Sequence, residues 1–270
     1  MCGRFVLASP VDRLAGHFAA SPDLDVAETY QPSFNVAPTH PAIGLVYDGS
    51  GHRRLRDFRW GLVPPWAADP SIGSRLFNAR AESVAGRPAF REAFRSRRLA
   101  VVADGFFEWR RGPGAVRRPL YLRRRDGAPL AFAGLWERWR GGEEGLGGGG
   151  DGWLRSCTII TTPANADLAG VHDRMPALLE AGALERWLDP GQSDARVLRR
   201  LLVPSPAGCL VGHPVSPLVG DVRNDGPWLI EPVEVPAEAA GPAGMLVEQP
   251  TLFDLEVDAD VAADGTPAPG

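Results

Sequence analysis

The sequence predicts an α+β fold: a single domain with a mostly antiparallel, barrel-like β core and flanking helices. Short segments rich in β-branched and aromatic residues, bounded by Gly, Pro or Asp, recur along the chain. Helical patterns are few and scattered, so a parallel βαβ winding is not expected. The 270 residues suffice to bury a sizeable core in one large domain.

The predicted strands share a β-rich composition and turn residues at their ends. In chain order they are 5–8, 42–47, 98–103, 105–110, 119–124, 130–137, 157–162 and 209–215. Four further segments have helical spacing: 11–20, 87–94, 182–189 and 193–202. We expect Ser9 to cap the first helix, with Pro10 in its first turn, and Ser193 to cap the last.

We expect one domain over residues 2–232 and an acidic, disordered tail over 233–270, where Pro, Ala, Glu and Asp dominate. The Gly-rich segment 141–152 reads as a domain linker or a flexible loop. Strands of similar character flank it on both sides, which favours the loop.

The chain has no Lys, and its charge is unevenly distributed. Residues 1–140 contain 22 Arg against 13 Asp and Glu, whereas residues 141–270 contain 7 against 20. Codon usage in a GC-rich genome explains the absence of Lys but not this segregation. A basic N-terminal half suits a polyanionic partner even though the net charge is −4.

The three cysteines, Cys2, Cys157 and Cys209, have no paired spacing. They therefore predict neither a disulfide framework nor a zinc site, and a reducing compartment is the simplest interpretation. No signal peptide and no apolar run long enough for a bilayer is expected. We expect a cytoplasmic protein that binds no membrane, metal or cofactor.

Cys2 stands directly behind the initiator Met, so loss of Met1 would expose an amine and a thiol on adjacent carbons. Their ordinary pKa values, about 7.7–8.0 and about 8.5, make both groups available as nucleophiles near neutral pH. Such an aminothiol condenses with an aldehyde to an imine and closes to a thiazolidine. The alternative is a small residue merely tolerated behind Met.

Two strand-like segments carry candidate partners for Cys2. In LFNARAESV, alternation places Asn78, Arg80 and Glu82 on one face, which is either a binding surface or a solvated edge. In ADGFFEWRR, Phe106 and Glu108 share one face, while Phe107 and Trp109 share the other. Aromatic neighbours would desolvate the Glu108 carboxyl and raise its pKa, which would suit it to proton transfer. The alternative is that Glu108 is a surface residue.

His172 lies in a polar segment that ends at Pro176, and histidine exchanges protons near neutral pH. A surface or structural role is the alternative. Trp66, in a Pro-rich loop, could stack on a base or close the core.

Seven ordered motifs resemble those of the SRAP family, the SOS-response-associated peptidases or abasic-site-processing proteins. They are MCGRF (1–5), FNVAP (34–38), WGLVPPW (60–66), NARAES (78–83), ADGFFEW (103–109), HDRMP (172–176) and HPVSPLVGDVRND (213–225). The resemblance implies a cleft for single-stranded DNA and a thiazolidine link between Cys2 and the aldehyde of an abasic site.

The resemblance also implies roles for individual residues. Asn78 would hold the sugar or amine, Glu108 would be the acid/base, and His172 would assist sugar opening and reversal of the link. The implied DNA contacts are Arg4, Pro38, Trp66, Arg80, Trp109 and, on a looser match, Arg87. The resemblance also implies that Met1 is removed, either by the domain itself or by an aminopeptidase. It further implies lyase-type Schiff-base chemistry.

The tail segment QPTLF resembles a peptide with which bacterial repair proteins bind the sliding clamp. Gln249, Leu252 and Phe253 would contact the clamp; alternatively this segment folds back on the domain. We expect a monomer, associated with the nucleoid through DNA.

Two rival functions remain. An N-terminal-nucleophile glutamine amidotransferase also begins Met-Cys-Gly, but such chains continue with Ile rather than Arg4 and carry motifs absent from this sequence. The second rival is a single-stranded DNA-binding module without crosslinking chemistry.

Overall fold

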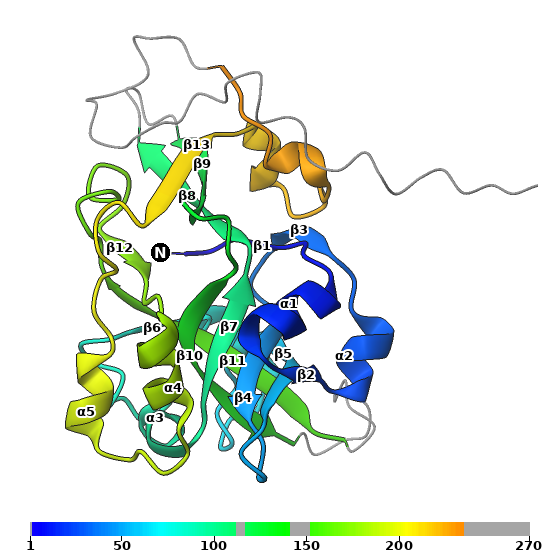
Figure 1. Ribbon diagram of the computed structural model, residues 1–270. Helices are drawn as coiled ribbons and strands as arrows, with labels where there is room; N and C mark the ends of the chain where they lie inside the picture. Colours follow the sequence, from blue (N-terminus) through cyan, green and yellow to red (C-terminus); the bar gives the residue numbers. More distant parts are fainter. Residues whose placement is uncertain (1, 112–116, 141–151, 235–270) are drawn as a thin grey trace, which may run out of the picture.

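The computed structural model describes residues 2–111, 117–140 and 152–234. Its described strands form two sheets, one above the other in Figure 1, with helices around the lower one. The larger sheet has the order β12-β11-β10-β7-β4-β5-β2, with β6 beside β11. The smaller has the order β13-β9-β8-β1-β3. The α+β prediction with a barrel-like core is confirmed.

Five strands of the larger sheet close into a barrel. They are β4 (Pro41–Tyr47), β5 (Arg53–Trp60), β7 (Arg98–Ala103), β10 (Leu130–Trp139) and β11 (Leu154–Pro163). Neighbours are antiparallel except at the closure, where β5 and β11 pair in parallel through Ser156–Arg59 and Cys157–Trp60. Closure removes the exposed edges of these strands and encloses an apolar core.

The smaller sheet is antiparallel throughout and consists of β1 (Phe5–Leu7), β3 (Ser33–Val36), β8 (Gly105–Arg111), β9 (Arg117–Arg124) and β13 (Leu210–Pro214). Its two faces pack into different clusters. Phe106 joins the barrel core, whereas Phe107 and Trp109 pack with Val6 and Leu229 on the opposite face. The alternation predicted for ADGFFEWRR is therefore confirmed.

Short helices cover the barrel (Figure 1). They are α1 (Val11–Phe18), α2 (Leu24–Thr29), α3 (Arg91–Ser96), α4 (Ala181–Leu188) and α5 (Ala195–Arg200). Neither serine predicted as a cap has that role. Ser9 donates its hydroxyl to Asp104 instead, and the N-cap of α5 is Asp194, which accepts from the Arg196 N–H at 2.7 Å.

Three short strands and three 3₁₀ helices complete the described elements: β2 (Ser21–Pro22), β6 (Asn78–Arg80), β12 (Arg174–Pro176), η1 (Pro70–Arg75), η3 (Pro217–Gly220) and η4 (Pro227–Leu229). The sequence pattern missed β5 because four Arg residues interrupt it. They leave Leu55, Phe58 and Trp60 buried, while Arg54 and Arg56 pair outside the barrel with Asp23.

All three cysteines are free. No helix in the described part of the chain is long and apolar enough to span a bilayer. The flexible-loop prediction for 141–152, apart from its last residue, and the tail prediction from 235 onward lie outside the described residues. The clamp-binding residues Gln249, Leu252 and Phe253 also lie there.

Candidate active site

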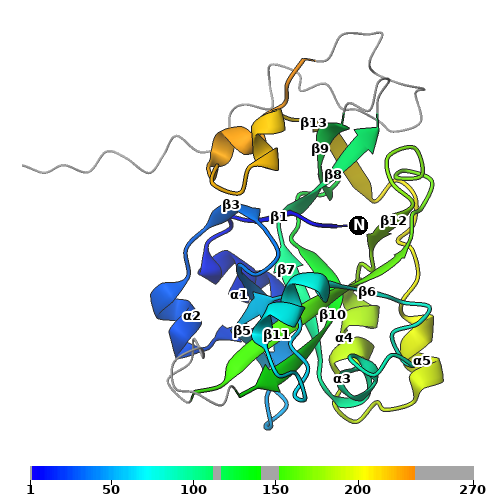
Figure 2. The same cartoon turned by 180° about the vertical axis from the view of Figure 1, so that it is seen from behind.

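The N-terminal segment runs from β1 toward β12, between the two sheets, in both views (Figures 1 and 2). β1 pairs with β8 through Phe5–Phe106, and the Phe107 N–H donates to the Arg4 carbonyl at 3.0 Å. This antiparallel register carries Cys2 alongside the part of β8 that contains Glu108.

Cys2 is fully buried, and its Sγ lies 3.9 Å from the Arg4 carbonyl oxygen as a hydrogen-bond donor. Burial raises the pKa of its thiol far above the ordinary value, and the nearby Glu108 carboxyl raises it further. These surroundings therefore favour the neutral thiol over the thiolate.

Asn78 connects β6 to the N-terminal segment. β6 pairs in parallel with β11 through Asn78–Ile159, and the Asn78 Nδ2 donates to the Cys2 carbonyl at 2.7 Å. The Oδ1 atom of the same side chain is buried and has no hydrogen-bond partner among the described residues. A buried acceptor of this kind is costly unless a donor reaches it.

Glu108 lies on β8 and is only 2% exposed. Burial raises the pKa of its carboxyl, while the nearby His172 lowers it in part. A carboxyl with a raised pKa, beside a thiol and an imidazole, is suited to donating and recovering a proton.

His172 precedes β12, and its Nδ1 accepts the Arg174 N–H at 2.9 Å. The Asp173 carboxylate also lies 2.9 Å from Nδ1, so it is placed to accept a hydrogen bond from that nitrogen.

Arg174 and Glu82 form a bidentate ion pair beside His172, which the sequence analysis did not predict. Arg174 is 8% exposed and donates to Glu82 at 2.6 and 3.0 Å and to the Thr161 carbonyl. The expectation of Glu82 on the face of a strand is wrong, because β6 ends at Arg80 and the chain then turns. The pattern could not show this because the ion pair joins residues 92 apart.

The predicted DNA contacts divide into exposed and enclosed groups. Arg80 and Arg87 are exposed near β6, and Trp66 is 63% exposed. Pro38 and Trp109 are half-buried, and Trp109 packs on the face of β8 opposite Glu108. Among these predicted contacts, only Arg80 and Arg87 are both exposed and close after Asn78 in the chain.

The loop that carries Trp66 is joined to the barrel on both sides of that residue. The Val63 N–H donates to Ser156 Oγ at 2.8 Å, and the Ala67 carbonyl accepts from the Trp139 indole at 2.7 Å.

Arg4 differs from the other predicted phosphate contacts. Its Nη1 donates to Asn35 Oδ1 at 2.7 Å and to the Val219 carbonyl at 2.5 Å, and its Nη2 donates to the Gly220 carbonyl at 3.0 Å. Both terminal nitrogens are therefore engaged within the protein.

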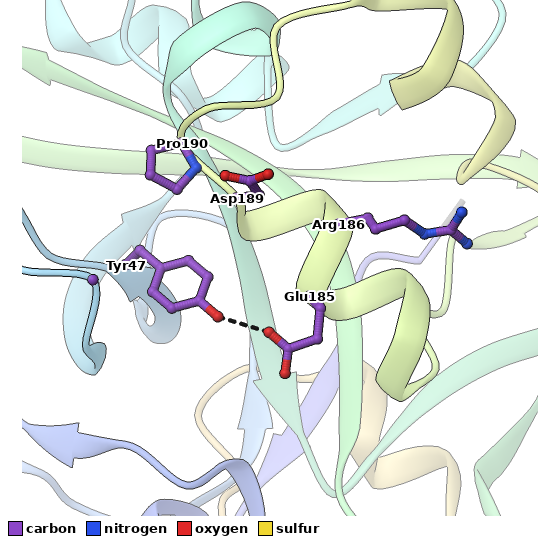
Figure 3. Close-up of a pocket in the computed structure, with 6 residues that line it drawn as sticks. Tyr47, Glu185, Arg186, Asp189 and Pro190 are labelled. Atoms are coloured by element: carbon purple, nitrogen blue, oxygen red, sulfur yellow. Dashed lines mark hydrogen bonds between the residues drawn. The ribbon is translucent and has the colours of Figure 1, made fainter.

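Other potential sites lie elsewhere. A pocket of about 420 Å³ between the β4–β5 turn and α4 is lined by Tyr47, whose hydroxyl donates to Glu185 at 2.7 Å (Figure 3). This pocket includes none of the predicted site residues. Within the described ranges, no group of three or more His, Cys, Asp and Glu side chains could hold a metal ion.

Comparison with known proteins identifies relatives of this chain. The abasic site processing protein YoqW of Bacillus subtilis (strain 168) is 39% identical over 231 residues, which cover 86% of this chain and 99% of that protein. The abasic site processing protein YedK of Escherichia coli (strain K12) is 31% identical over 242 residues, or 86% and 100% of the two chains. The abasic site processing protein HMCES of Gallus gallus is 32% identical over 248 residues, or 79% and 70%.

A solved structure of a protein from Bacteroides thetaiotaomicron shares the fold, with a TM-score of 0.74 and 24% identity over 86% of this chain and all of that one. A sequence model described as SOS response associated peptidase (SRAP) matches residues 1–222. The chain therefore belongs to the SRAP family.

Proposed function

We propose that this protein processes abasic sites in single-stranded DNA during repair, through a covalent thiazolidine link to Cys2 formed after Met1 is removed. The observation that carries the proposal is the convergence of Cys2, Asn78, Glu108 and His172 from four separate segments. Relatives named abasic site processing proteins support it. We assign the activity to the domain over residues 2–232.

The proposed reaction begins when the sugar of the abasic site opens to an aldehyde. The Cys2 amine bonds to the aldehyde carbon, and Glu108 donates its proton to the resulting hydroxyl, which leaves as water. The thiol then gives its proton to the Glu108 carboxylate, and Sγ bonds to the same carbon. One water is lost overall, Glu108 is regenerated, and no oxidant is needed.

The surroundings of each group support these roles. The raised pKa of Glu108 keeps a proton available, and the buried site excludes the water that would hydrolyse the imine. Asn78 fixes the Cys2 carbonyl through Nδ2, which leaves Oδ1 to accept from the freed amine or a sugar hydroxyl. The His172 imidazole would assist sugar opening at the ring oxygen and later reversal.

DNA would reach this centre across the exposed basic residues near β6. Arg80 and Arg87, which are exposed, would contact phosphates, and Trp66 would stack on a base further along the strand. Met1 must leave first, whether by self-cleavage or by an aminopeptidase, because an amide nitrogen cannot form the imine.

The deciding experiment incubates the purified protein with single-stranded DNA that bears one abasic site. The expected result is a heat-stable adduct that is absent with undamaged DNA and with Cys2→Ala, and whose mass shows that Met1 is missing. A Cys209→Ala variant serves as the matched control and keeps full yield. Absence of the adduct from the unmodified chain, or an adduct that retains Met1, would overturn the proposal. Glutamine hydrolysis without an adduct would favour the amidotransferase.

A further inference from the structure

The N-terminal segment faces a physical problem, because the first residues of a chain fray unless they are tied down. β1 contains only three residues, and Cys2 lies outside it. We propose that Arg4 and Asn35, together with the carbonyls of Val219 and Gly220, form a latch that positions Cys2. The inference rests on the proposed function and assigns Arg4 a positioning role in place of phosphate binding.

Asn35 on β3 is the hub of this latch and is 1% exposed. Its Oδ1 accepts from Arg4 at 2.7 Å, and its Nδ2 donates to the carbonyls of Asp221 and Asn224 at 3.1 and 2.8 Å. One amide thus joins the N-terminal segment to the loop after η3. A buried amide with both ends satisfied fixes the geometry of the groups it binds.

Arg4 completes the connection from the other side. It donates to the backbone of η3 and to Asn35, and burial lowers the pKa of its guanidinium while the Asp221 charge opposes that effect. Binding a phosphate would require it to give up hydrogen bonds in a partly desolvated position. Arg80, which is exposed, would bind a phosphate without that cost.

The segment that holds Arg4 is itself firmly seated. Val219 and Leu229 are fully buried and pack with Val6 and Phe107 on the smaller sheet. The Phe34 N–H also donates to Asp225 Oδ1 at 2.6 Å. The η3–η4 segment is therefore held firmly against the smaller sheet. Through the latch it restrains Arg4, which lies two positions from Cys2.

Positioning of this kind should appear in the rate of chemistry rather than in DNA affinity. A displacement of about 1 Å at a reacting group can cost about 100-fold in rate. For Arg4→Met and Asn35→Leu we therefore expect adduct formation at saturating DNA to slow at least about tenfold. The half-saturating DNA concentration should stay unchanged, and Arg4→Lys, which keeps one donor group, should restore part of the rate.

Two control variants separate the latch from its alternatives. Tyr30→Phe removes hydrogen bonds to the Leu7 and Ser9 carbonyls, at the opposite end of β1, so it should lower thermal stability without slowing the adduct. Arg80→Ala, at the proposed DNA surface, should weaken DNA binding and reduce its salt dependence, which the latch variants should not do. Equal slowing by Tyr30→Phe at a matched loss of stability would overturn the latch.

A second readout does not depend on DNA. Because Cys2 is buried, iodoacetamide should label it slowly, and opening the latch should speed its labelling at least tenfold while buried Cys157 stays protected. Unchanged labelling in both latch variants would overturn the proposal. So would an Arg4→Met variant that loses affinity and salt dependence as Arg80→Ala does. If the unmodified chain forms no adduct, the proposed function fails, and labelling still decides the latch.

Discussion

The centre around Cys2 and the rim around Arg80 use side chains in opposite ways. At the centre, Cys2 and Glu108 are buried, and burial raises the pKa of both groups. At the rim, Arg80, Arg87 and Trp66 are exposed. Chemistry needs fixed groups in a dry environment, whereas capture of a flexible polyanion needs accessible charge. The comparison predicts that changes at the centre alter rates and changes at the rim alter affinity.

The largest effect after loss of Cys2 is expected from Glu108→Gln. The amide keeps the shape but cannot transfer the proton, so the saturated rate of adduct formation should fall about 10²–10⁴-fold. Affinity for undamaged single strands, measured by fluorescence anisotropy, should not change. A variant that loses binding as well as rate would show that Glu108 shapes the DNA site and would break the distinction between centre and rim.

Asn78→Ala should have the next largest effect. It removes the hydrogen bond to the Cys2 carbonyl and the buried Oδ1 acceptor, and one such bond corresponds to about tenfold in rate. Single-turnover kinetics at saturating DNA measure this decrease. Gln192→Ala, which changes a side-chain amide that accepts from the Asp194 N–H at 2.8 Å between α4 and α5, is the matched control and should react at the normal rate.

A smaller effect is expected at the rim. Arg80→Ala should weaken binding to undamaged single strands, and the slope of log affinity against log salt should become shallower by about 0.7 for each phosphate that the variant no longer neutralises. The rate at saturating DNA should stay the same. A titration series in salt measures the slope, and an unchanged slope would remove Arg80 from the DNA surface.

The smallest effect tests whether a raised pKa alone marks a catalytic centre. Burial and the neighbouring Asp25 raise the pKa of Asp57 on β5 to about 6. The folded state therefore favours the protonated form of Asp57. The stability that this protonated form contributes is fully present below the unfolded pKa, near 4, and is lost as the pH rises through about 6. The stability of Asp57→Asn relative to the parent should therefore be greater at pH 7 than at pH 4.

Thermal melts at the two pH values measure this difference, and adduct formation should be unaffected, because Asp57 lies outside the Cys2 centre. A loss of adduct in Asp57→Asn would show that the barrel exterior takes part in the reaction. A stability gain at pH 4 that equals the gain at pH 7 would contradict the titration argument.

Local patterns predicted several elements well. The spacing of Phe106, Phe107 and Glu108 was sufficient to assign the faces of β8, because side chains alternate along any strand. The helix caps were harder to predict, because they depend on which hydrogen bonds form in the folded chain. Ser9 donates to Asp104 rather than capping a helix, and Asp194 rather than Ser193 caps α5. The Arg-rich β5 was missed because its outward charges find partners only in the folded chain.

The sequence by itself determined the types of residue available, the strand alternation and the family motifs. The tertiary structure decided the rest: the parallel closure of β5 on β11, the burial of Cys2 against Glu108, and the partners of Arg4. The physical reason is the separation along the chain of the residues that interact. Alternation depends on neighbours in the chain, whereas burial and hydrogen bonds join segments up to 216 residues apart, and these interactions set pKa values and donor availability.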